Sequence, residues 1–257
     1  MALVLAVVNQ KGGVGKTTTS VNLSAYLALR GKKTLLIDID PQGNATSGVG
    51  LEKKELDKTI YDVLINNDDI KDVILTTGRK NLSICPANIQ LAGAEIELVA
   101  MLSRENILKR ALQGIRNQYD FIIMDCPPSL GLITLNALTA TDGIIVPIQS
   151  EYYALEGLTQ LMDTINIVKK HLNPSLDILG VVVTMFDSRT QLSHQVAAEV
   201  KKYFGEKLFK TIVPRNVRLS EAPSFGLAIN EYDSKSKGAD AYEFLAKEVI
   251  KRSATFK

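Results

Sequence analysis

The segment NQKGGVGKTTT, at residues 9–19, contains the residue types that bind phosphate groups. Its ending, Gly15-Lys16-Thr17, matches the end of the P-loop pattern G-x-x-x-x-G-K-[ST]. In that pattern backbone N–H groups surround the phosphates, the lysine reaches the β- and γ-phosphates, and the hydroxyl binds Mg²⁺. The alternative is a glycine-rich turn without a ligand. It is disfavoured because the segment lies between an apolar run and a helical pattern, where phosphates bind. The segment therefore predicts a nucleotide site with Mg²⁺.

This segment departs from the usual pattern in two ways. The first glycine of the pattern would stand at position 10, where the sequence has Gln10, and two adjacent glycines follow at Gly12 and Gly13. An additional lysine, Lys11, precedes Lys16 by five residues. Since a P-loop contains one phosphate-binding lysine, Lys11 needs a separate explanation.

Acidic residues follow two of the apolar runs. Asp125 ends the run in FIIMDCPPSLG, residues 121–131, as does a Walker-B residue that steers Mg²⁺ through its water shell. Asp38 and Asp40 stand in LLIDIDPQGN, residues 35–44. A carboxylate beside phosphates is repelled unless it handles a metal or the attacking water, so these acids indicate such a role. A solvated turn is the alternative that their spacing leaves open.

Seven short apolar runs alternate with helical patterns along the chain. Continuous apolarity is typical of strands buried on both faces of a parallel sheet. The β-α-β-α order predicts right-handed crossovers and an α/β fold, with one doubly wound, mostly parallel sheet and helices on both faces. No linker, repeat or low-complexity tract interrupts residues 1–257, so we expect one domain. The runs are 3–8, 34–37, 82–85, 121–124, 143–148, 179–186 and 208–213.

Helices are expected where apolar residues recur with helical spacing. Ser103 is expected to cap one that runs to about Gln118. In an open parallel sheet, ligands bind at the carboxyl ends of the strands, which is where the glycine segment and the acids fall. In the helix 191–204 the residues expected to face the core are Leu192, Val196, Val200, Tyr203 and Phe204. The expected helices span 17–29, 103–118, 156–172, 191–204 and 239–252.

The composition is that of an ordinary soluble globular protein. The chain has 257 residues, 46% of them hydrophobic, and a net charge of +2, which excludes a polyanion-coating tail but not a local basic patch. Cys85 and Cys126 have no paired spacing, so neither a disulfide scaffold nor a zinc cluster is indicated, and Cys126 is expected to be a packed thiol. No run approaches the ~18 apolar residues of a membrane span, and the apolar start lacks a basic n-region, so we expect a cytoplasmic protein.

Four motifs, taken together and in order, resemble those of one known family. They are KGGVGKTT, DIDPQGNATSG, DCPPSLG and PRNVRLSEAPSFG, and they are similar to motifs of the ParA/Soj family of chromosome-partitioning ATPases. That family lies in the deviant-Walker-A group, which also includes MinD, and the resemblance covers essentially the whole chain. It implies a deviant P-loop form of the doubly wound sheet. It also implies slow, Mg²⁺-dependent hydrolysis of ATP to ADP and phosphate.

The resemblance also implies roles for single residues. Lys11 matches the signature lysine that crosses a dimer interface to the partner's nucleotide, and Asp40 matches the acid that positions or activates the hydrolytic water. With Lys16, these are the catalytic candidates. Thr17 and Asp125 match the Mg²⁺ roles, the latter through water. Adding the loop that frames the adenine, the expected nucleotide-binding set is Lys11, Gly12, Gly13, Val14, Gly15, Lys16, Thr17, Thr18, Pro214, Arg215 and Asn216.

Residues 189–218 carry seven Lys or Arg against two acids. Such an excess is typical of binding to a phosphate backbone, although a solvated basic face explains the count equally well. The resemblance favours DNA, because Arg189 and Arg218 match basic residues that contact DNA in Soj-like proteins. Lys201 and Lys202, on the outer side of the helix 191–204, complete the expected surface. Since no base-reading motif is present, we expect non-specific binding of double-stranded DNA by an ATP-bound homodimer that combines two weak patches.

The family implies a ParB/Spo0J-like protein as a further partner and a nucleoid-associated location. The main alternative is a MinD-like membrane-associated cell-division ATPase, which would end in an amphipathic helix lying in the bilayer interface. The tail instead places Tyr242, Leu245, Val249 and Ile250 on one stripe, which favours docking on the core, and no stable membrane association is expected. An iron–sulfur reductase would need suitably placed cysteines, and a small-molecule ligase or kinase would need an acceptor pocket that no motif indicates.

Overall fold

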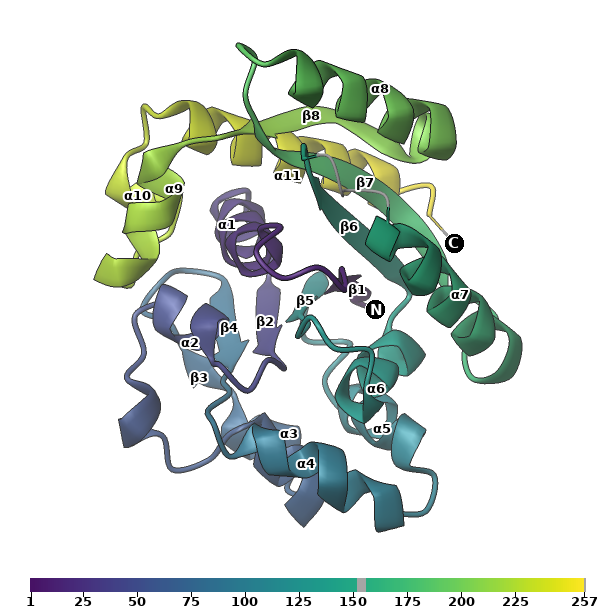
Figure 1. The fold of residues 1–257 in the computed structure, drawn as a ribbon. Coiled ribbons are helices and arrows are strands. Elements are labelled where there is room, and N and C mark those ends of the chain that lie inside the picture. The colour runs from purple at the N-terminus through teal and green to yellow at the C-terminus, as the bar shows by residue number, and fades with distance from the viewer. Residues whose placement is uncertain (152–155, 257) are drawn as a thin grey trace.

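The computed structural model of the chain describes residues 1–151 and 156–256. Within them, eight strands form one sheet that is covered by helices on both faces (Figure 1). The strand order is β3-β4-β2-β5-β1-β6-β7-β8, and every neighbouring pair is parallel except β3 with β4. The strands are β1 Leu3–Val7, β2 Thr34–Asp38, β3 Leu75–Thr76, β4 Leu82–Cys85, β5 Phe121–Asp125, β6 Gly143–Gln149, β7 Asp177–Phe186 and β8 Leu208–Pro214.

Helices connect the strands and cover both faces of the sheet: α1 and α11 pack on one face, and α4 to α8 pack on the other (Figure 1). This arrangement confirms the predicted fold class. The helices are α1 Lys16–Leu29, α2 Asn44–Gly48, α3 Ile70–Val73, α4 Leu91–Glu97, α5 Ile107–Gln113, α6 Leu132–Ala140, α7 Glu156–His171, α8 Gln191–Phe204, α9 Val217–Glu221, α10 Ile229–Tyr232 and α11 Lys237–Ser253.

All seven predicted strands are present in the sheet. The sequence did not indicate β3, an antiparallel edge strand of two residues, Leu75 and Thr76, both of them exposed. Because a two-residue exposed strand needs no apolar run, it leaves no periodicity to detect.

The helix predicted from Ser103 to Gln118 is wrong at both ends. Ser103 has a left-handed backbone, φ 51°, and its side chain caps nothing. The α-helix α5 begins only at Ile107 and ends at Gln113. Serine favours caps by propensity, but the left-handed φ of Ser103 is incompatible with the extended geometry of an N-cap residue.

The buried face of α8 is narrower than the sequence predicted. Val196, Val200 and Phe204, spaced four residues apart, are buried. Leu192 is 40% exposed and Tyr203 is 61% exposed, so both predictions of core positions are wrong. α8 packs on β7 and β8 at the edge of the sheet, and one strip of side chains is enough to cover that contact.

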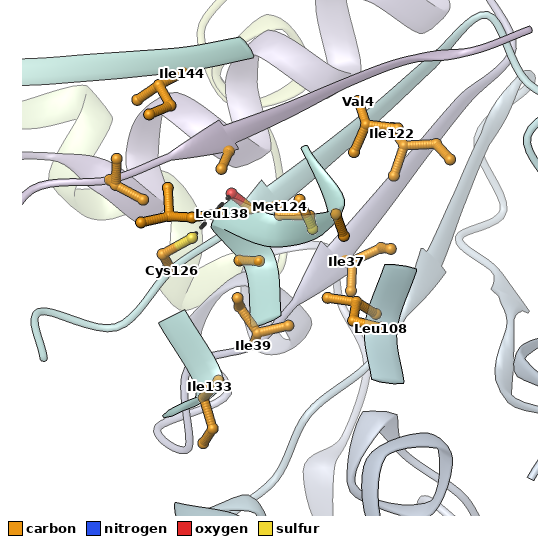
Figure 2. Close-up of a cluster of buried hydrophobic side chains, with 14 of the residues drawn as sticks. Val4, Ile37, Ile39, Leu108, Ile122, Met124, Cys126, Ile133, Leu138 and Ile144 are labelled. Carbon is orange, nitrogen blue, oxygen red and sulfur yellow. Dashed lines mark hydrogen bonds between the residues drawn. The ribbon is translucent and has the colours of Figure 1, made fainter. Parts of the chain in front are cut away.

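The core consists of two layers of apolar side chains, one on each face of the sheet. Neighbouring residues of a strand point to opposite layers: Val4 faces α5, α6 and α7, whereas Leu5 faces α1 and α11. Figure 2 shows the first layer, into which Cys126 directs its thiol, 3.9 Å from the carbonyl oxygen of Met124. Cys126 is fully buried, and burial raises the pKa of its thiol, which agrees with its prediction as a packed residue.

The register of the central strands brings their carboxyl ends together. Asp125, at the end of β5, pairs with Val7 of β1 on one side and with Asp38 of β2 on the other. The loops that follow these three strands therefore leave the same edge of the sheet side by side. They contain residues 8–15, 39–43 and 126–131.

The C-terminal helix α11 docks on the sheet and on α1. Tyr242, Leu245 and Val249 are buried, and the Tyr242 hydroxyl lies 3.1 Å from that of Thr19 in α1. The apolar stripe predicted from the sequence thus covers the core. No helix within the described residues is both long and apolar enough to span a membrane.

The docking of α11 predicts opposite outcomes for two adjacent substitutions. Leu245→Ala should lower the free energy of unfolding by about 2–5 kcal/mol, because it leaves a cavity in the core. Phe244→Ala should change it by less than about 0.5 kcal/mol, since Phe244 is 56% exposed. Urea denaturation of both variants checks this, and a larger effect at Phe244 than at Leu245 would contradict the packing.

Candidate nucleotide site

The glycine segment turns sharply between β1 and α1. Gly13 and Gly15 have left-handed backbones, with φ 73° and 86°, which glycine adopts without steric cost. Gly15 directly precedes α1, so the first N–H groups of α1 point into the loop. Val14 is buried, and its carbonyl accepts a hydrogen bond of 2.8 Å from the Thr184 hydroxyl at the end of β7. The loop is thereby fixed as a concave set of backbone donors, the form that binds phosphate.

Lys16 lies inside this loop. It is only 7% exposed, and its ammonium donates a 3.1 Å hydrogen bond to the carbonyl oxygen of Lys11. Burial lowers the pKa of Lys16, while the neighbouring carboxyl groups of Asp125 and Asp40 act in the opposite direction. A buried ammonium surrounded by acids is placed to meet a polyanion with its bound cation.

Asp125 combines full burial with incomplete hydrogen bonding. One carboxylate oxygen accepts a 2.8 Å hydrogen bond from Ser20, and Oδ2 has no partner among the described residues. Burial and, next, the charge of Asp38 raise the pKa of Asp125 to about 8, against the hydroxyls of Thr17 and Ser20, which lower it. An unpartnered buried carboxylate oxygen beside a threonine hydroxyl fits the water shell of Mg²⁺.

The two acids after β2 have different surroundings. Asp38 is fully buried and accepts hydrogen bonds of 2.8 Å from both the N–H and the hydroxyl of Thr46, and of 3.1 Å from the N–H of Asp40. Asp38 therefore holds the backbone of the 38–46 loop in place. Asp40 is only 9% exposed but lines the cavity beside the glycine segment, and its carboxylate accepts a hydrogen bond of 2.9 Å from the N–H of Gln42. Of the pair, Asp40 is the acid that a ligand can reach.

Two adjoining cavities open along this edge of the sheet. The first is lined by the glycine segment and Lys16, by Asp40 to Gln42, and by Pro127 to Ser129. The second is lined by the predicted adenine loop, Pro214 to Asn216, together with Thr184 and Tyr242. The structure thus brings the predicted phosphate and adenine residues together in one groove. Residues common to both cavities are Gly15, Thr18 and Met185.

Sequence reasoning missed several of the lining residues. Thr184 and Met185 lie near the end of β7 and belong to no motif, and Met185 has an unusual positive φ of 51°. Pro127 to Ser129 stand inside the DCPPSLG motif, where only Asp125 was assigned a role. Their place after an apolar strand, at the edge where ligands bind, was the available signal.

Lys11 points away from its own phosphate cavity. Its ammonium lies 3.6 Å from a carboxylate oxygen of Glu151, after β6, and its side chain is 34% exposed. The other Glu151 oxygen lies 3.6 Å from the guanidinium of Arg215. Glu151 was not predicted from the sequence, because a lone glutamate after a strand has no pattern. Lys11 is therefore at the surface, where a second molecule can reach it.

The predicted DNA-contacting residues lie in two places. Arg189 precedes α8 and is paired with Asp187, at 2.7 and 2.9 Å, and Arg218 in α9 is paired with Glu221 at 2.9 Å. These arginines lie at the carboxyl ends of β7 and β8, where the N–H of Arg215 bonds the carbonyl of Phe186. The structure does not bring Lys201 and Lys202 to them. Both are in the last turn of α8, about 16 Å from its start.

Fold and groove define a P-loop nucleotide-binding protein of the doubly wound α/β class. The family model described as "AAA domain" matches residues 2–178. The sporulation initiation inhibitor protein Soj of Bacillus subtilis (strain 168) is 60% identical over 249 residues, 97% of this chain and 98% of that protein. The chromosome-partitioning ATPase Soj of Treponema pallidum (strain Nichols) is 52% identical over 252 residues, 98% of each chain. The chain belongs to the ParA/Soj family of chromosome-partitioning ATPases, as its four motifs predicted.

A solved structure extends the comparison to the fold. Cobyrinic acid a,c-diamide synthase from Mycobacterium smegmatis, with bound ADP and magnesium, has a TM-score of 0.88 to this chain and 38% sequence identity. The alignment covers 100% of this chain and 97% of that one. The name of that protein describes a different reaction, so this likeness supports the fold, while the assignment to partitioning rests on the sequence relatives.

The burial of Asp125 predicts a pH dependence of stability in the nucleotide-free protein. Its pKa rises from 3.8 to about 8 on folding, so the folded state binds the proton more tightly than the unfolded state. The stability that this proton contributes is fully present below about pH 4 and is lost as the pH rises through about 8. In Asp125→Asn, which cannot ionise there, the melting temperature should fall less between pH 5 and 8.

Thermal melts of the wild type and of Asp125→Asn, each with and without Mg²⁺ and ATP, check this prediction. ATP with Mg²⁺ should raise the melting temperature of the wild type more than ATP alone does, and Asp125→Asn should lose this additional rise. Asp57→Asn, at an exposed acid, serves as the control and should behave like the wild type. An equal pH slope in the wild type and in Asp125→Asn would contradict the assignment.

Proposed function

We propose that this partitioning ATPase is a Mg²⁺-dependent switch that dimerises when it binds ATP, binds DNA as the dimer and hydrolyses ATP slowly. The observation that carries the proposal is the different position of two lysines of one loop. Lys16 lies within the phosphate cavity, whereas Lys11, on the same loop, lies outside it at the surface. We also propose that residues 1–257 act as one ATPase domain, since a single sheet includes strands from Leu3 to Pro214.

ATP would bind along the groove, with its phosphates at the N-terminus of α1 and its adenine beside Pro214, Arg215 and Asn216. Thr17 and, through water, Asp125 would hold Mg²⁺, which neutralises charge on the β- and γ-phosphates. Asp40 would orient a water molecule for attack on the γ-phosphorus. The bond to the bridging oxygen then breaks, and the products are ADP and phosphate. Each of these groups acts by position and charge, which is most of what phosphoryl transfer requires.

A second subunit would complete the charge at the phosphates. Lys16 is the lysine that lines the cavity, and a second lysine cannot arrive from Lys11 of the same chain while that side chain points to Glu151. In a face-to-face dimer each Lys11 would reach the nucleotide of the partner subunit. Hydrolysis would then depend on assembly, and turnover would be slow because it waits for the dimer.

DNA binding is proposed for the edge that carries Arg189 and Arg218. Their ion pairs with Asp187 and Glu221 are exposed, so such pairs contribute little and can exchange for DNA phosphates. Two such edges in a dimer would bind more tightly than one, and binding would be non-specific and salt-dependent. This activity supports a nucleoid-associated location in the cytoplasm and a ParB/Spo0J-like partner that stimulates turnover. We assign no stable membrane association, because the apolar stripe of α11 is already buried.

The variant Lys11→Ala tests the dimer. It should bind ATP with wild-type affinity, because Lys11 does not line the cavity, yet lose both ATP-dependent dimerisation and turnover. Sedimentation in ATP, in ADP and without nucleotide, combined with phosphate release, measures each property. Asp40→Ala is the matched control, since it should keep the ATP-dependent dimer and lose only turnover. A Lys11→Ala protein that still dimerised in ATP would refute the proposed role.

The variant Arg189→Glu tests the DNA surface. In ATP it should weaken binding to random-sequence double-stranded DNA by roughly tenfold and reduce the salt dependence of that binding. Lys80→Glu, at an exposed lysine before β4, on the opposite edge of the sheet, is the control and should retain binding. The pair Lys201→Glu and Lys202→Glu decides whether the far end of α8 also takes part. Undiminished binding by Arg189→Glu would exclude the surface.

A further inference from the structure

The loop after β5 is fixed at its far end by a side chain from another helix. α6 begins at Leu132, and its N-cap residue is Gly131, which has no side chain to satisfy the first N–H groups. Glu95 of α4 supplies the missing acceptors: its Oε2 accepts from the N–H of Leu132 at 2.8 Å, and its Oε1 accepts from that of Ile133 at 3.2 Å. A carboxylate at this position is also favoured by the dipole of the helix.

The close contact with Glu95, and not the backbone conformation, favours glycine at position 131. Gly131 has φ −81° and ψ −167°, a conformation that any residue adopts. A Cβ atom at this position would lie 2.5 and 2.6 Å from the carboxylate oxygens of Glu95. Gly131 therefore permits the close approach of Glu95 to the start of α6.

The same segment also contacts the other catalytic loop. The N–H of Ala87, shortly before α4, donates a 2.9 Å hydrogen bond to the Thr46 hydroxyl, which in turn donates to Asp38. Glu95 holds the start of α6, which directly follows the loop containing Pro127 to Ser129, and this loop lines the phosphate cavity together with Asp40. Residues 87–95 thus contact the starts of α2 and α6, the two helices that directly follow the loops bordering the phosphate cavity. Three α4-face residues, Leu91, Ala94 and Leu98, are fully buried and fix this segment on the core.

We propose that Glu95 is a positioning residue for ATP hydrolysis. It holds the 126–131 loop in the place where Pro127 to Ser129 face Asp40 across the phosphate cavity. This inference rests on the proposed ATPase mechanism, in which attack depends on the distance between the water at Asp40 and the γ-phosphate. Without Glu95 the first turn of α6 loses its cap and the loop moves more freely. The position of the loop should affect turnover more than ATP binding, because in the proposed mechanism the glycine segment would make most of the phosphate contacts.

Four variants test the proposal. Glu95→Ala and Gly131→Ala should each lower kcat between about fivefold and 100-fold, the range from a lost helix cap to a misplaced reacting group, with little change in ATP affinity. Glu95→Gln keeps one acceptor and should lie between Glu95→Ala and the wild type. In the double variant Glu95→Ala/Gly131→Ala the clash is absent, so kcat should equal that of Glu95→Ala alone. Glu97→Ala, an exposed neighbour bonded to Tyr61, is the control and should keep wild-type kcat.

Hydrogen–deuterium exchange gives a readout that does not need activity. Glu95→Ala and Gly131→Ala should increase exchange at residues 127–133 without lowering the melting temperature enough to unfold the protein in the assay. A wild type without turnover would refute the proposed function, and the exchange data would still decide the role of Glu95. Wild-type kcat in Glu95→Ala, unchanged exchange, or additive effects in the double variant would each overturn the inference.

Discussion

Asp38 and Asp125 end neighbouring parallel strands in register and are both fully buried, so two carboxylates face each other where water cannot separate them. The surroundings of the two carboxylates differ. Asp38 is stabilised by hydrogen bonds from Asp40 and Thr46, and burial still raises its pKa to about 6. Asp125 keeps one oxygen without a partner. The surrounding structure supplies positive charge and donors at the same edge, through Lys16 and the start of α1. A bound cation would compensate the negative charge of the acids, and a bound polyanion would compensate the positive charge of Lys16.

The parts of this arrangement that could be predicted from the sequence are those encoded in contiguous residues. Near-continuous apolar runs gave all the parallel strands, and the glycine segment, Asp40 and Asp125 follow such runs directly. The rest depends on contacts between distant residues. Glu95 caps a helix 37 residues away, and Glu151 meets Lys11 across the loop edge. Ser103 had the right residue type for a cap and the wrong backbone, which only the packed fold determines. The count of basic residues along 189–218 likewise could not show that Arg189 and the pair Lys201 and Lys202 lie at opposite ends of α8.

The different surroundings of Asp38 and Asp40 also depend on the packed fold and not on local sequence. Spacing alone could not separate Asp38 from Asp40, since both follow the same strand. In the fold Asp38 faces the interior and Asp40 faces the groove, because β2 ends at Asp38 and the chain bends at Asp40. Thr46 joins Asp38 to Ala87, so the loop carrying Asp40 is anchored at both ends on the rigid sheet and on the segment before α4. Asp40 therefore has little freedom to move, which suits the positioning role proposed for it.

Glu151 gives the exposed Lys11 a further property. Because Lys11 and Arg215 already share this carboxylate, an incoming phosphate does not meet a free cation. The phosphate must displace the Glu151 carboxylate from Lys11, so one negative group is exchanged for another. In the proposed dimer, a triphosphate has more charge with which to compete than a diphosphate. The carboxylate would then act as a filter for the length of the phosphate chain, rejecting the product while it accepts the substrate.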